Sequence, residues 1–167
     1  SPLIFISLLD DLIKVSSKYR YLFQLITSFL ILRFGNFQLF LSGSLHGIFL
    51  FIFLMIFLTA CINFTNFMDG SDGLVSGCMF VFFLTLNLKL QNSLPITILL
   101  GALANFIYWN WAPAKVFMGD VGSTFLGIYF SANLLQMENN SEIIGLLLVC
   151  SPFFGDALIT IFRRFLA

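Results

Sequence analysis

Aspartate is the residue type in this 167-residue chain whose spacing could do chemistry. Five of the six aspartates stand in three short polar segments, DDLIK at 10–14, FMDGSDG at 67–73 and KVFMGDVGST at 115–124. Carboxylates brought together repel one another unless a positive charge lies among them. Magnesium suits such a place, because it takes a few carboxylate oxygens and completes its shell with waters and phosphate oxygens.

Glycines and lysines in the same segments extend the prediction to a diphosphate. Backbone N–H groups beside glycine can approach a phosphate closely, and Lys14 and Lys115 add positive charge. Gly122 and Ser123 are expected where a helix begins, and helix N-termini bind anions. We therefore predict a site for a metal ion and a diphosphate group.

The elements that position these segments are expected to be membrane helices. Apolar residues make up 59% of the chain and charged residues 10%, whereas soluble domains have roughly 25% charged residues. This composition is typical of a membrane protein. The formal net charge is zero, so nothing in the charge favours nucleic acid, and we expect no nucleic-acid partner.

Apolar runs predict an all-α fold, a polytopic membrane bundle of about six transmembrane helices. The run at 1–9 is expected to be the remnant of an earlier helix. Pro152 and Gly155 are expected to bend or break the last span. The six expected spans are 20–35, 45–66, 74–90, 94–112, 123–137 and 143–162.

Helices that cross a membrane alternate in direction, so every second connector shares a face. By this count 10–18, 67–73 and 113–122 lie together, with Arg163 and Arg164. Basic residues concentrate on that face, which the positive-inside rule assigns to the cytoplasm. The aspartates expected on the same face are Asp10, Asp11, Asp69, Asp72 and Asp120.

The acidic segments also have plainer interpretations. Asp10 and Asp11 could begin a solvated helix, where the helix dipole favours carboxylates. Asp69 and Asp72 could be turn residues. The functional interpretation rests on the coincidence that three separate acidic connectors fall on one face.

Polar residues inside the apolar runs likewise have two interpretations. Asn63 and Asn66 could hydrogen-bond a neighbouring helix. Asp156, within the last span, is a candidate buried functional acid, since intramembrane carboxylates usually serve function. The alternative for Asp156 is a buried carboxylate paired with a Ser, Thr or Asn side chain.

Four segments occur in the order typical of one family: DDLIK (10–14), NFTNFMDGSDGL (63–74), NWAPAKVFMGDVGSTFLG (110–127) and PFFGDALITIFRR (152–164). Over essentially its whole length the chain resembles the polyprenyl-phosphate N-acetylhexosamine-1-phosphate transferases of glycosyltransferase family 4. The resemblance implies transfer of a sugar-1-phosphate from a UDP-N-acetylhexosamine to undecaprenyl phosphate, with release of UMP. It also implies Mg²⁺, with Mn²⁺ as the alternative, and an active site facing the cytoplasm in the lipid bilayer of a bacterial inner (plasma) membrane.

The resemblance further implies roles for individual residues. The catalytic residues are Asp10, Asp11 and Asp120. The metal ligands are Asp120, Asn66 and Asp11. The nucleotide- or substrate-binding residues are Lys14, Asn63, Asp69, Asp72, Asn110, Phe117, Arg163 and Arg164. Within that set Asp72 faces uracil and Phe117 stacks on it. Because the lipid phosphate is already anionic, we expect direct attack without a strong general base.

The family pattern continues beyond this chain, into further helices before 10–14 and a His-containing loop after 152–164. We therefore expect residues 1–167 to be a fragment of one transmembrane catalytic domain. The ending PFFGDALITIFRR resembles the branch that initiates O-antigen (lipopolysaccharide), teichoic-acid or capsule-type glycans, which favours N-acetylglucosamine or a 6-deoxy-N-acetylhexosamine in the donor. Phospho-MurNAc-pentapeptide transfer is the alternative within the family. A homodimer is left open.

Two other classes of protein fit part of the pattern. An ion-coupled transporter would use Asp156 and the broken last helix. Its substrate residues should lie at mid-depth, however, and not in loops on one face. A structural membrane subunit would leave the three acidic segments unexplained.

Overall fold

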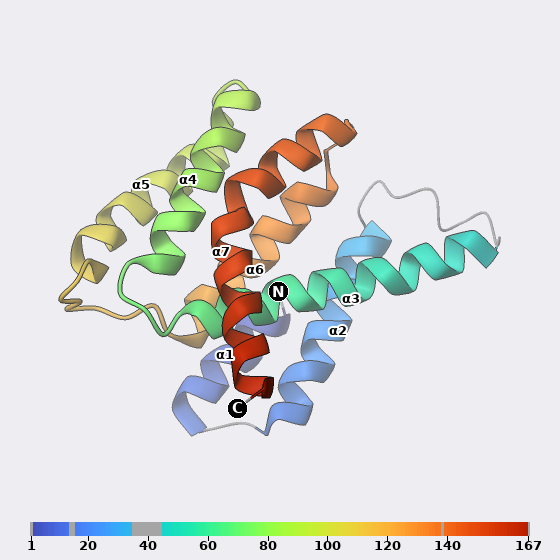
Figure 1. Ribbon diagram of the computed structural model, residues 1–167, viewed down its shortest axis with the longest axis horizontal. Helices are drawn as coiled ribbons and strands as arrows, with labels where there is room; N and C mark the ends of the chain where they lie inside the picture. The colour runs from blue at the N-terminus through green and yellow to red at the C-terminus, as the bar shows by residue number, and fades with distance from the viewer. Residues whose placement is uncertain (1, 14–15, 35–44, 138, 167) are drawn as a thin grey trace. The chain divides into compact units, whose positions relative to one another are not determined.

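The computed structural model describes residues 2–13, 16–34, 45–137 and 139–166. Every regular element in these ranges is an α-helix (Figure 1), which confirms the all-α prediction. The helices are α1 (Pro2–Ile13), α2 (Ser17–Phe34), α3 (Leu45–Met68), α4 (Leu74–Lys89), α5 (Leu94–Asn110), α6 (Gly119–Leu135) and α7 (Asn140–Leu166). Each expected span overlaps one of the helices α2 to α7, and residues 2–9 of the expected remnant belong to α1.

Length and apolar composition single out α3 as a candidate to cross a membrane, with a mean hydropathy of 2.6 in its most apolar window. Only 22% of that window is buried inside the protein, so α3 is not a core helix enclosed by others. Counting the two arms of α7 as one span gives a second candidate among the described residues. The helices α4 and α5 are apolar but shorter, and six spans stay a prediction.

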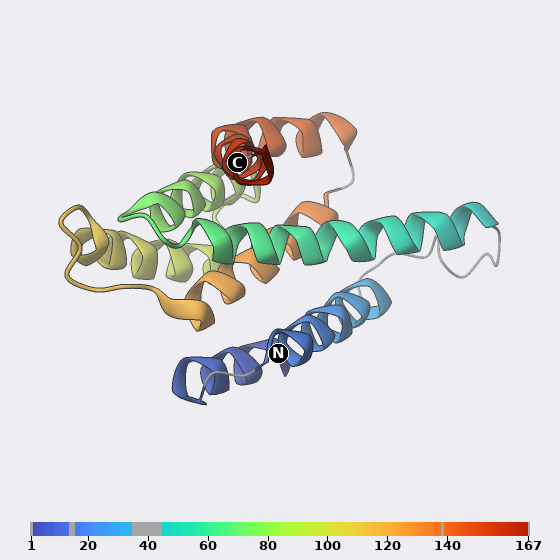
Figure 2. The same ribbon diagram turned by 60° about the horizontal axis from the view of Figure 1, so that its bottom comes forward.

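Helix α7 is bent, as the proline at 152 predicts. Its arms Ile143–Ser151 and Phe153–Thr160 meet at 56°, and Figure 2 shows the C-terminal arm nearly end-on while the first arm runs across the view. Proline has no N–H for the helical ladder, and its ring crowds the preceding turn.

The chain divides into two compact units. Unit 1 comprises Ser1–Asn66 and Gly119–Gln136, and therefore contains α1, α2, most of α3, and α6. Unit 2 comprises Phe67–Met118 and Met137–Ala167, and therefore contains α4, α5 and α7. The connector between α5 and α6, residues 111–118, belongs to unit 2.

The helices of unit 1 are joined by apolar and polar contacts. Leu3 and Ile6 of α1 form a buried cluster with Ile62 of α3, and α1 also packs against α2 and α6. Gln24 of α2 and Asn63 of α3 exchange two hydrogen bonds of 3.0 Å each. Such side-chain amide bonds can hold helices together where water is scarce.

Unit 2 is built around α4, which packs against α5 and α7 (Figure 1). Phe82 and Phe83 of α4 are fully buried, and their rings meet edge to face with centroids 5.0 Å apart. Asn87 Nδ2 donates to Thr97 Oγ1 at 3.1 Å, close to the turn that joins α4 to α5. The hairpin of α4 and α5 thus places Gly73 and Asn110 at its other end.

Candidate functional site

Two aspartates of unit 1 converge on one arginine. Nη1 of Arg20 donates to Asp10 Oδ2 at 2.5 Å and to Asp120 Oδ2 at 2.9 Å. The carboxylate of Asp10 is 10% exposed, and that of Asp120 is 33% exposed. Two residues 110 positions apart in the sequence therefore present oxygens to a single point, which a guanidinium nitrogen fills.

Three helix ends bring these side chains together. Asp10 lies in the last turn of α1, Arg20 in the first turns of α2, and Asp120 in the first turn of α6. A helix dipole favours a carboxylate at the N-terminus and disfavours one at the C-terminus. The first turn of α6 thus supports Asp120, whereas Asp10 needs a cation such as Arg20 nearby.

The position of Asp10 decides one of the open interpretations. Asp10 and Asp11 do not begin a helix, because α1 continues through both residues to Ile13. The interpretation as a solvated helix start is therefore wrong. The side chain of Asp11 and all of Lys14 lie outside the described residues, so their predicted roles stay predictions.

The predicted anion site at Gly122 and Ser123 needs correction. Helix α6 begins at Gly119, so Ser123 lies within the helix and is fully buried. Its hydroxyl donates to the carbonyl oxygen of Gly119 at 3.1 Å, a bond within its own helix. The first turn of α6, with its open backbone N–H groups, instead contains Asp120.

The two predicted asparagines of α3 differ in what they contact. Asn66 Nδ2 donates to Ser123 Oγ at 3.4 Å, which places Asn66 beside the helix turn that carries Asp120. Its carbonyl oxygen does not make that bond and can serve as a ligand. Asn63 instead pairs with Gln24 and donates to the carbonyl oxygen of Thr59 at 2.9 Å. The geometry of Asn63 is that of a helix-to-helix contact.

A second group of predicted residues forms a pocket in unit 2. The pocket has a volume of about 600 Å³. Its walls include the backbone or side chains of Ser71, Asp72, Gly73, Cys78, Trp111 and Ala112. The DGSDG turn and the start of the α5–α6 connector therefore face a common space.

The buried side chain of Asn110 connects the segments that form this pocket. It is 5% exposed, and its carbonyl oxygen accepts from the Gly73 N–H at 3.1 Å and from Ser76 Oγ at 3.0 Å. Its Nδ2 donates to the carbonyl oxygen of Val116 at 2.9 Å. Gly73 has φ 72° as the residue before α4, a conformation that glycine adopts without steric cost.

Asp72 provides a second hydrogen bond between the DGSDG turn and the α5–α6 connector. Its carboxylate accepts a hydrogen bond of 3.0 Å from the Ala114 N–H, while the residue itself is exposed. The turn interpretation and the binding interpretation of Asp72 are thus compatible, because one oxygen can fix the loop while the other faces the pocket.

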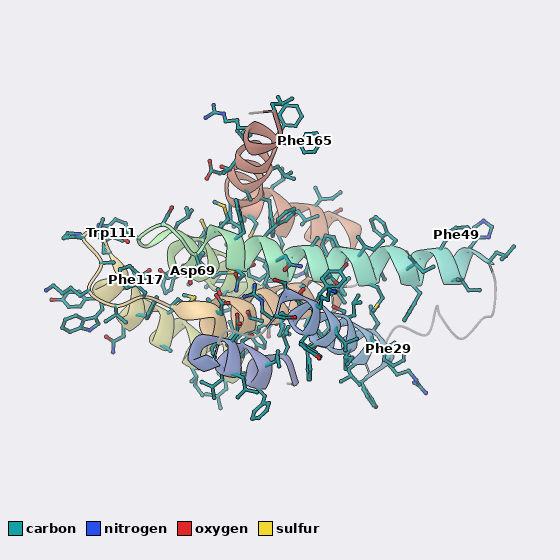
Figure 3. The ribbon with its side chains drawn as sticks, turned by 90° about the horizontal axis from the view of Figure 1, so that it is seen from below. Phe29, Phe49, Asp69, Trp111, Phe117 and Phe165 are labelled. Carbon is teal, nitrogen blue, oxygen red and sulfur yellow. The ribbon has the colours of Figure 1, made fainter. Side chains whose placement is uncertain are left out.

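Aromatic side chains lie exposed on the connector after α5. Trp111 is 65% exposed and Phe117 is 71% exposed, and both project from that connector (Figure 3). Nζ of Lys115 lies 5.6 Å from the ring centroid of Trp109, a cation–π distance. Phe117 is therefore open to a flat partner, as the stacking prediction requires.

The remaining predicted residues are placed as follows. Asp69 is half-buried in the turn after α3, and Arg163 is exposed on α7. The side chain of Arg164 lies outside the described residues. No group of three or more His, Cys, Asp or Glu side chains gathers within the part of the chain that the structure describes.

The prediction that Asp156 is buried is wrong, since this residue is exposed. The buried face of α7 is a stripe at helical spacing that consists of Leu146, Cys150, Phe153 and Ala157. Asp156 lies just off this stripe. Of the two features that motivated the transporter hypothesis, the burial of Asp156 is not found among the described residues, whereas the bend in α7 is.

Arg20 was missed as a site residue, because basic residues near helix ends were assigned to membrane topology. A signal was nevertheless present. Helix α1 ends at Ile13 and α2 begins at Ser17, so positions 10 and 20 each lie three residues from these helix ends and should face each other. Gln24, the partner of Asn63, carried no such signal, because that contact joins helices that are distant in sequence.

A divalent cation fits the donor set of unit 1. Magnesium is held by one or two carboxylates with waters and phosphate oxygens, at 2.0–2.1 Å from each oxygen. Asp10 and Asp120 supply two carboxylate oxygens that already converge on one cationic nitrogen, and Asn66 adds a carbonyl oxygen beside α6. A third carboxylate is not needed for this ion.

Comparison with known proteins identifies the family of the chain. The sequence model described as Glycosyl transferase family 4 matches residues 1–138, more than half of the chain. The chain therefore belongs to glycosyl transferase family 4, a family of transferases.

Particular relatives narrow the comparison. The chain is 28% identical, over 98% of its length, to half of the probable undecaprenyl-phosphate N-acetylglucosaminyl 1-phosphate transferase of Bacillus subtilis. It is 29% identical over 84% of its length to half of a phospho-N-acetylmuramoyl-pentapeptide-transferase of Fervidobacterium nodosum. A Latilactobacillus sakei protein of the latter name is 38% identical over 65% of the chain, which corresponds to 37% of that relative. The chain thus spans half or less of these curated relatives.

Proposed function

We propose that the complete protein transfers a hexosamine-1-phosphate from a UDP-sugar to a polyprenyl phosphate, with release of UMP. The proposal is carried by one observation: Asp10 and Asp120 present carboxylate oxygens to a single cationic point. Such a point suits a metal ion that draws two anionic substrates together. Family membership supports the same class of reaction.

The metal site would consist of Asp10, Asp120 and Asn66, with Asp11 as a further ligand that the family resemblance implies. When bound, Mg²⁺ would neutralise the diphosphate and stabilise the departing phosphate oxygen. Asp120 is well placed for this, because it lies in the first turn of α6, where the helix dipole favours a carboxylate. The contact with Ser123 would orient the side chain of Asn66 toward the metal.

The uridine would bind in the pocket of unit 2. Asp72 would accept a hydrogen bond from the base, and Phe117 would offer its exposed ring for stacking. Asn110 would act as a positioning residue, since its amide is engaged with Gly73, Ser76 and Val116. Asp69, Lys14, Arg163 and Arg164 remain the candidates for further contacts with the donor or the lipid.

The acceptor phosphate would attack directly. A phosphate ester is anionic near neutral pH and does not require a strong base to become a nucleophile. Asp10 and Asp11 would therefore position and balance charge more than they move protons. Positioning and electrostatic stabilisation of the two anions together account for most of the barrier reduction in phosphoryl transfer.

Two donors remain candidates. The relative that covers nearly all of this chain is named for N-acetylglucosaminyl 1-phosphate transfer, which agrees with the donor favoured by the ending PFFGDALITIFRR. Relatives named for phospho-N-acetylmuramoyl-pentapeptide transfer support the other donor equally. An O-antigen, teichoic-acid or capsule pathway belongs to the first possibility and peptidoglycan synthesis to the second.

The proposed setting is a bacterial plasma membrane. The relatives are bacterial proteins, one of them named for transfer to undecaprenyl phosphate, and a polyprenyl acceptor resides in a bilayer. The helices would cross it several times, with the acidic residues at the cytoplasmic face where the UDP-sugar is available.

The complete protein in detergent, supplied with undecaprenyl phosphate, should release UMP from UDP-GlcNAc or UDP-MurNAc-pentapeptide only with MgCl₂ present. We expect Asp120→Asn to lower the rate by at least about a hundredfold, because a charged ligand is lost at the point where charge develops. Glu142→Gln, which removes a carboxylate that stands in none of the three acidic segments, is the matched control. UMP release that persists in EDTA, or that survives Asp120→Asn, would overturn the metal assignment.

A further inference from the structure

Arg20 lies where a metal ion would lie. Its Nη1 is within hydrogen-bond distance of Asp10 Oδ2 and Asp120 Oδ2 at once. The two oxygens are therefore separated by no more than two hydrogen-bond lengths, with the nitrogen between them. A magnesium ion that took both oxygens at 2.0–2.1 Å would need that same position.

Charge balance leads to the same conclusion. The guanidinium supplies one positive charge between two carboxylates. A divalent ion in its place would supply two, and would attract both carboxylates more strongly. With no cation between them, the two carboxylates would repel each other.

We propose that Arg20 is a positioning residue that holds Asp10 and Asp120 together in the cation-free protein and yields its place when a divalent cation binds. This inference rests on the proposed function, because it takes the metal to bind at Asp120. Arg20 sets the cation concentration that the site requires, since each binding event must first displace the guanidinium. It also preorganises the site, because α1 and α6 do not have to be drawn together anew.

The first experiment measures cation binding through stability, without substrates. The complete protein in detergent is heated at increasing MgCl₂, and the half-saturating concentration for the rise in Tm is recorded. We expect Arg20→Gln to lower Tm in the absence of magnesium and to increase the rise in Tm that magnesium causes. The half-saturating magnesium concentration should fall about fivefold, as expected for loss of one partly exposed ion pair. Arg20→Lys, which restores a charge, should return toward the parent.

Arg33→Gln is the matched control, because Arg33 lies exposed at the other end of the same helix. It should leave the half-saturating concentration unchanged. Asp120→Asn should abolish the magnesium response altogether. If that variant responds like the parent, the proposed metal site fails. If the site responds as expected but Arg20→Gln has the parent's half-saturating concentration, only the role of Arg20 fails.

A second measurement uses the unaltered protein and so does not depend on how variants fold. Phenylglyoxal modifies accessible arginines, and mass spectrometry gives the rate at each one. Saturating magnesium should raise the rate at Arg20 several-fold, because the displaced guanidinium leaves its two carboxylates, and should leave the rate at Arg33 unchanged. A rate at Arg20 that magnesium lowers or does not alter overturns the inference.

Discussion

The carboxamide of Asn110 ties three separate stretches of unit 2 together. Its oxygen accepts from the Gly73 N–H and Ser76 Oγ, and its nitrogen donates to the Val116 carbonyl. A buried polar group that loses its partner costs roughly 1–3 kcal/mol. Asn110 therefore links the DGSDG turn to the connector that carries Phe117.

Asn110→Ala should lower stability by about 2 kcal/mol, because it leaves buried partners unpaired. Both loops of the pocket should loosen, so the KM for the UDP-sugar should rise as well. Thermal unfolding and UMP-release kinetics of the complete protein measure the two effects. Asn133→Ala is the control, since Asn133 donates to Tyr129 within its own helix. Equal losses of stability in the two variants would contradict the proposed link between the two loops through Asn110.

Asp72 allows the turn and binding roles to be separated. Asp72→Asn keeps an oxygen for the Ala114 N–H and should leave thermal stability within about 0.5 kcal/mol, whereas Asp72→Ala removes it and should cost about 1 kcal/mol. If the carboxylate contacts the nucleotide, both variants should raise the KM for the UDP-sugar at least about tenfold, the loss of one charged hydrogen bond. A KM raised only by the alanine variant would assign Asp72 to the turn alone.

Residue chemistry could be predicted from the sequence where the signal was local. Asp120 stands beside Gly119 at a helix start, and Asp72–Gly73 forms the turn that such a pair suggests. The pairing of Gln24 with Asn63 depends on how α2 packs against α3, and no local pattern encodes it. The contact of Arg20 with Asp10 could have been predicted, because it depends only on the short connection between α1 and α2.

At the scale of helices, α3 and α6 approach closely at Gly127. A Cβ added there would lie 3.0 Å from Ile62 Cα and 3.2 Å from Thr65 Cβ. Backbone atoms cannot move aside as a flexible side chain can. The approach also brings Asn66, one turn further along α3, to Ser123, one turn earlier on α6.

Gly127→Ala should therefore destabilise unit 1 by roughly 1–3 kcal/mol, the range for overpacked helix contacts. Gly101→Ala is the matched control, because nothing lies within 4 Å of a Cβ at that position on α5. Alanine is the better helix former, so this control should be neutral or slightly stabilising. Thermal unfolding of both variants is the measurement, and a Gly127→Ala protein as stable as the control would refute the close approach.

Helix positions followed from the lengths of apolar runs, but helix ends did not. The polar residues Asp10, Asp11, Gly119 and Asp120 were counted as connectors, although each lies inside a helix. An apolar run ends at the first polar residue, whereas a helix continues for as long as its backbone N–H and C=O groups pair with each other. For the same reason the sequence misplaced the N-terminus of α6 by about one turn.

At the scale of the whole molecule, exposed apolar surface favours a membrane setting. Phe49, Phe53 and Ile56 on α3 are each more than 60% exposed, and water disfavours apolar surface of this extent. Figure 3 shows such side chains, among them the labelled Phe29 and Phe49, projecting away from the helices of unit 1. A lipid environment would cover this surface.

The hairpin of α4 and α5 tests this setting most directly. Its helices have 16 and 17 residues, or about 25 Å at 1.5 Å per residue, slightly less than the roughly 30 Å of a bilayer core. Lys89 and the turn at 90–93 lie at one end, and the pocket of unit 2 lies at the other. A short span can be completed when flanking polar chains reach the interface and the bilayer thins locally.

If the hairpin crosses the bilayer, Asn92 and Phe117 lie on opposite faces. In spheroplasts a membrane-impermeant maleimide should label an Asn92→Cys variant at once and a Phe117→Cys variant only after permeabilisation. Both positions are exposed, so access to the label does not differ for other reasons. Mapping the modified peptide by mass spectrometry separates these labels from reaction at Cys61, Cys78 and Cys150. Equal labelling of the two variants in intact spheroplasts would place both loops on the same face and rule out a spanning hairpin, and with it a pocket that only the cytoplasm can supply.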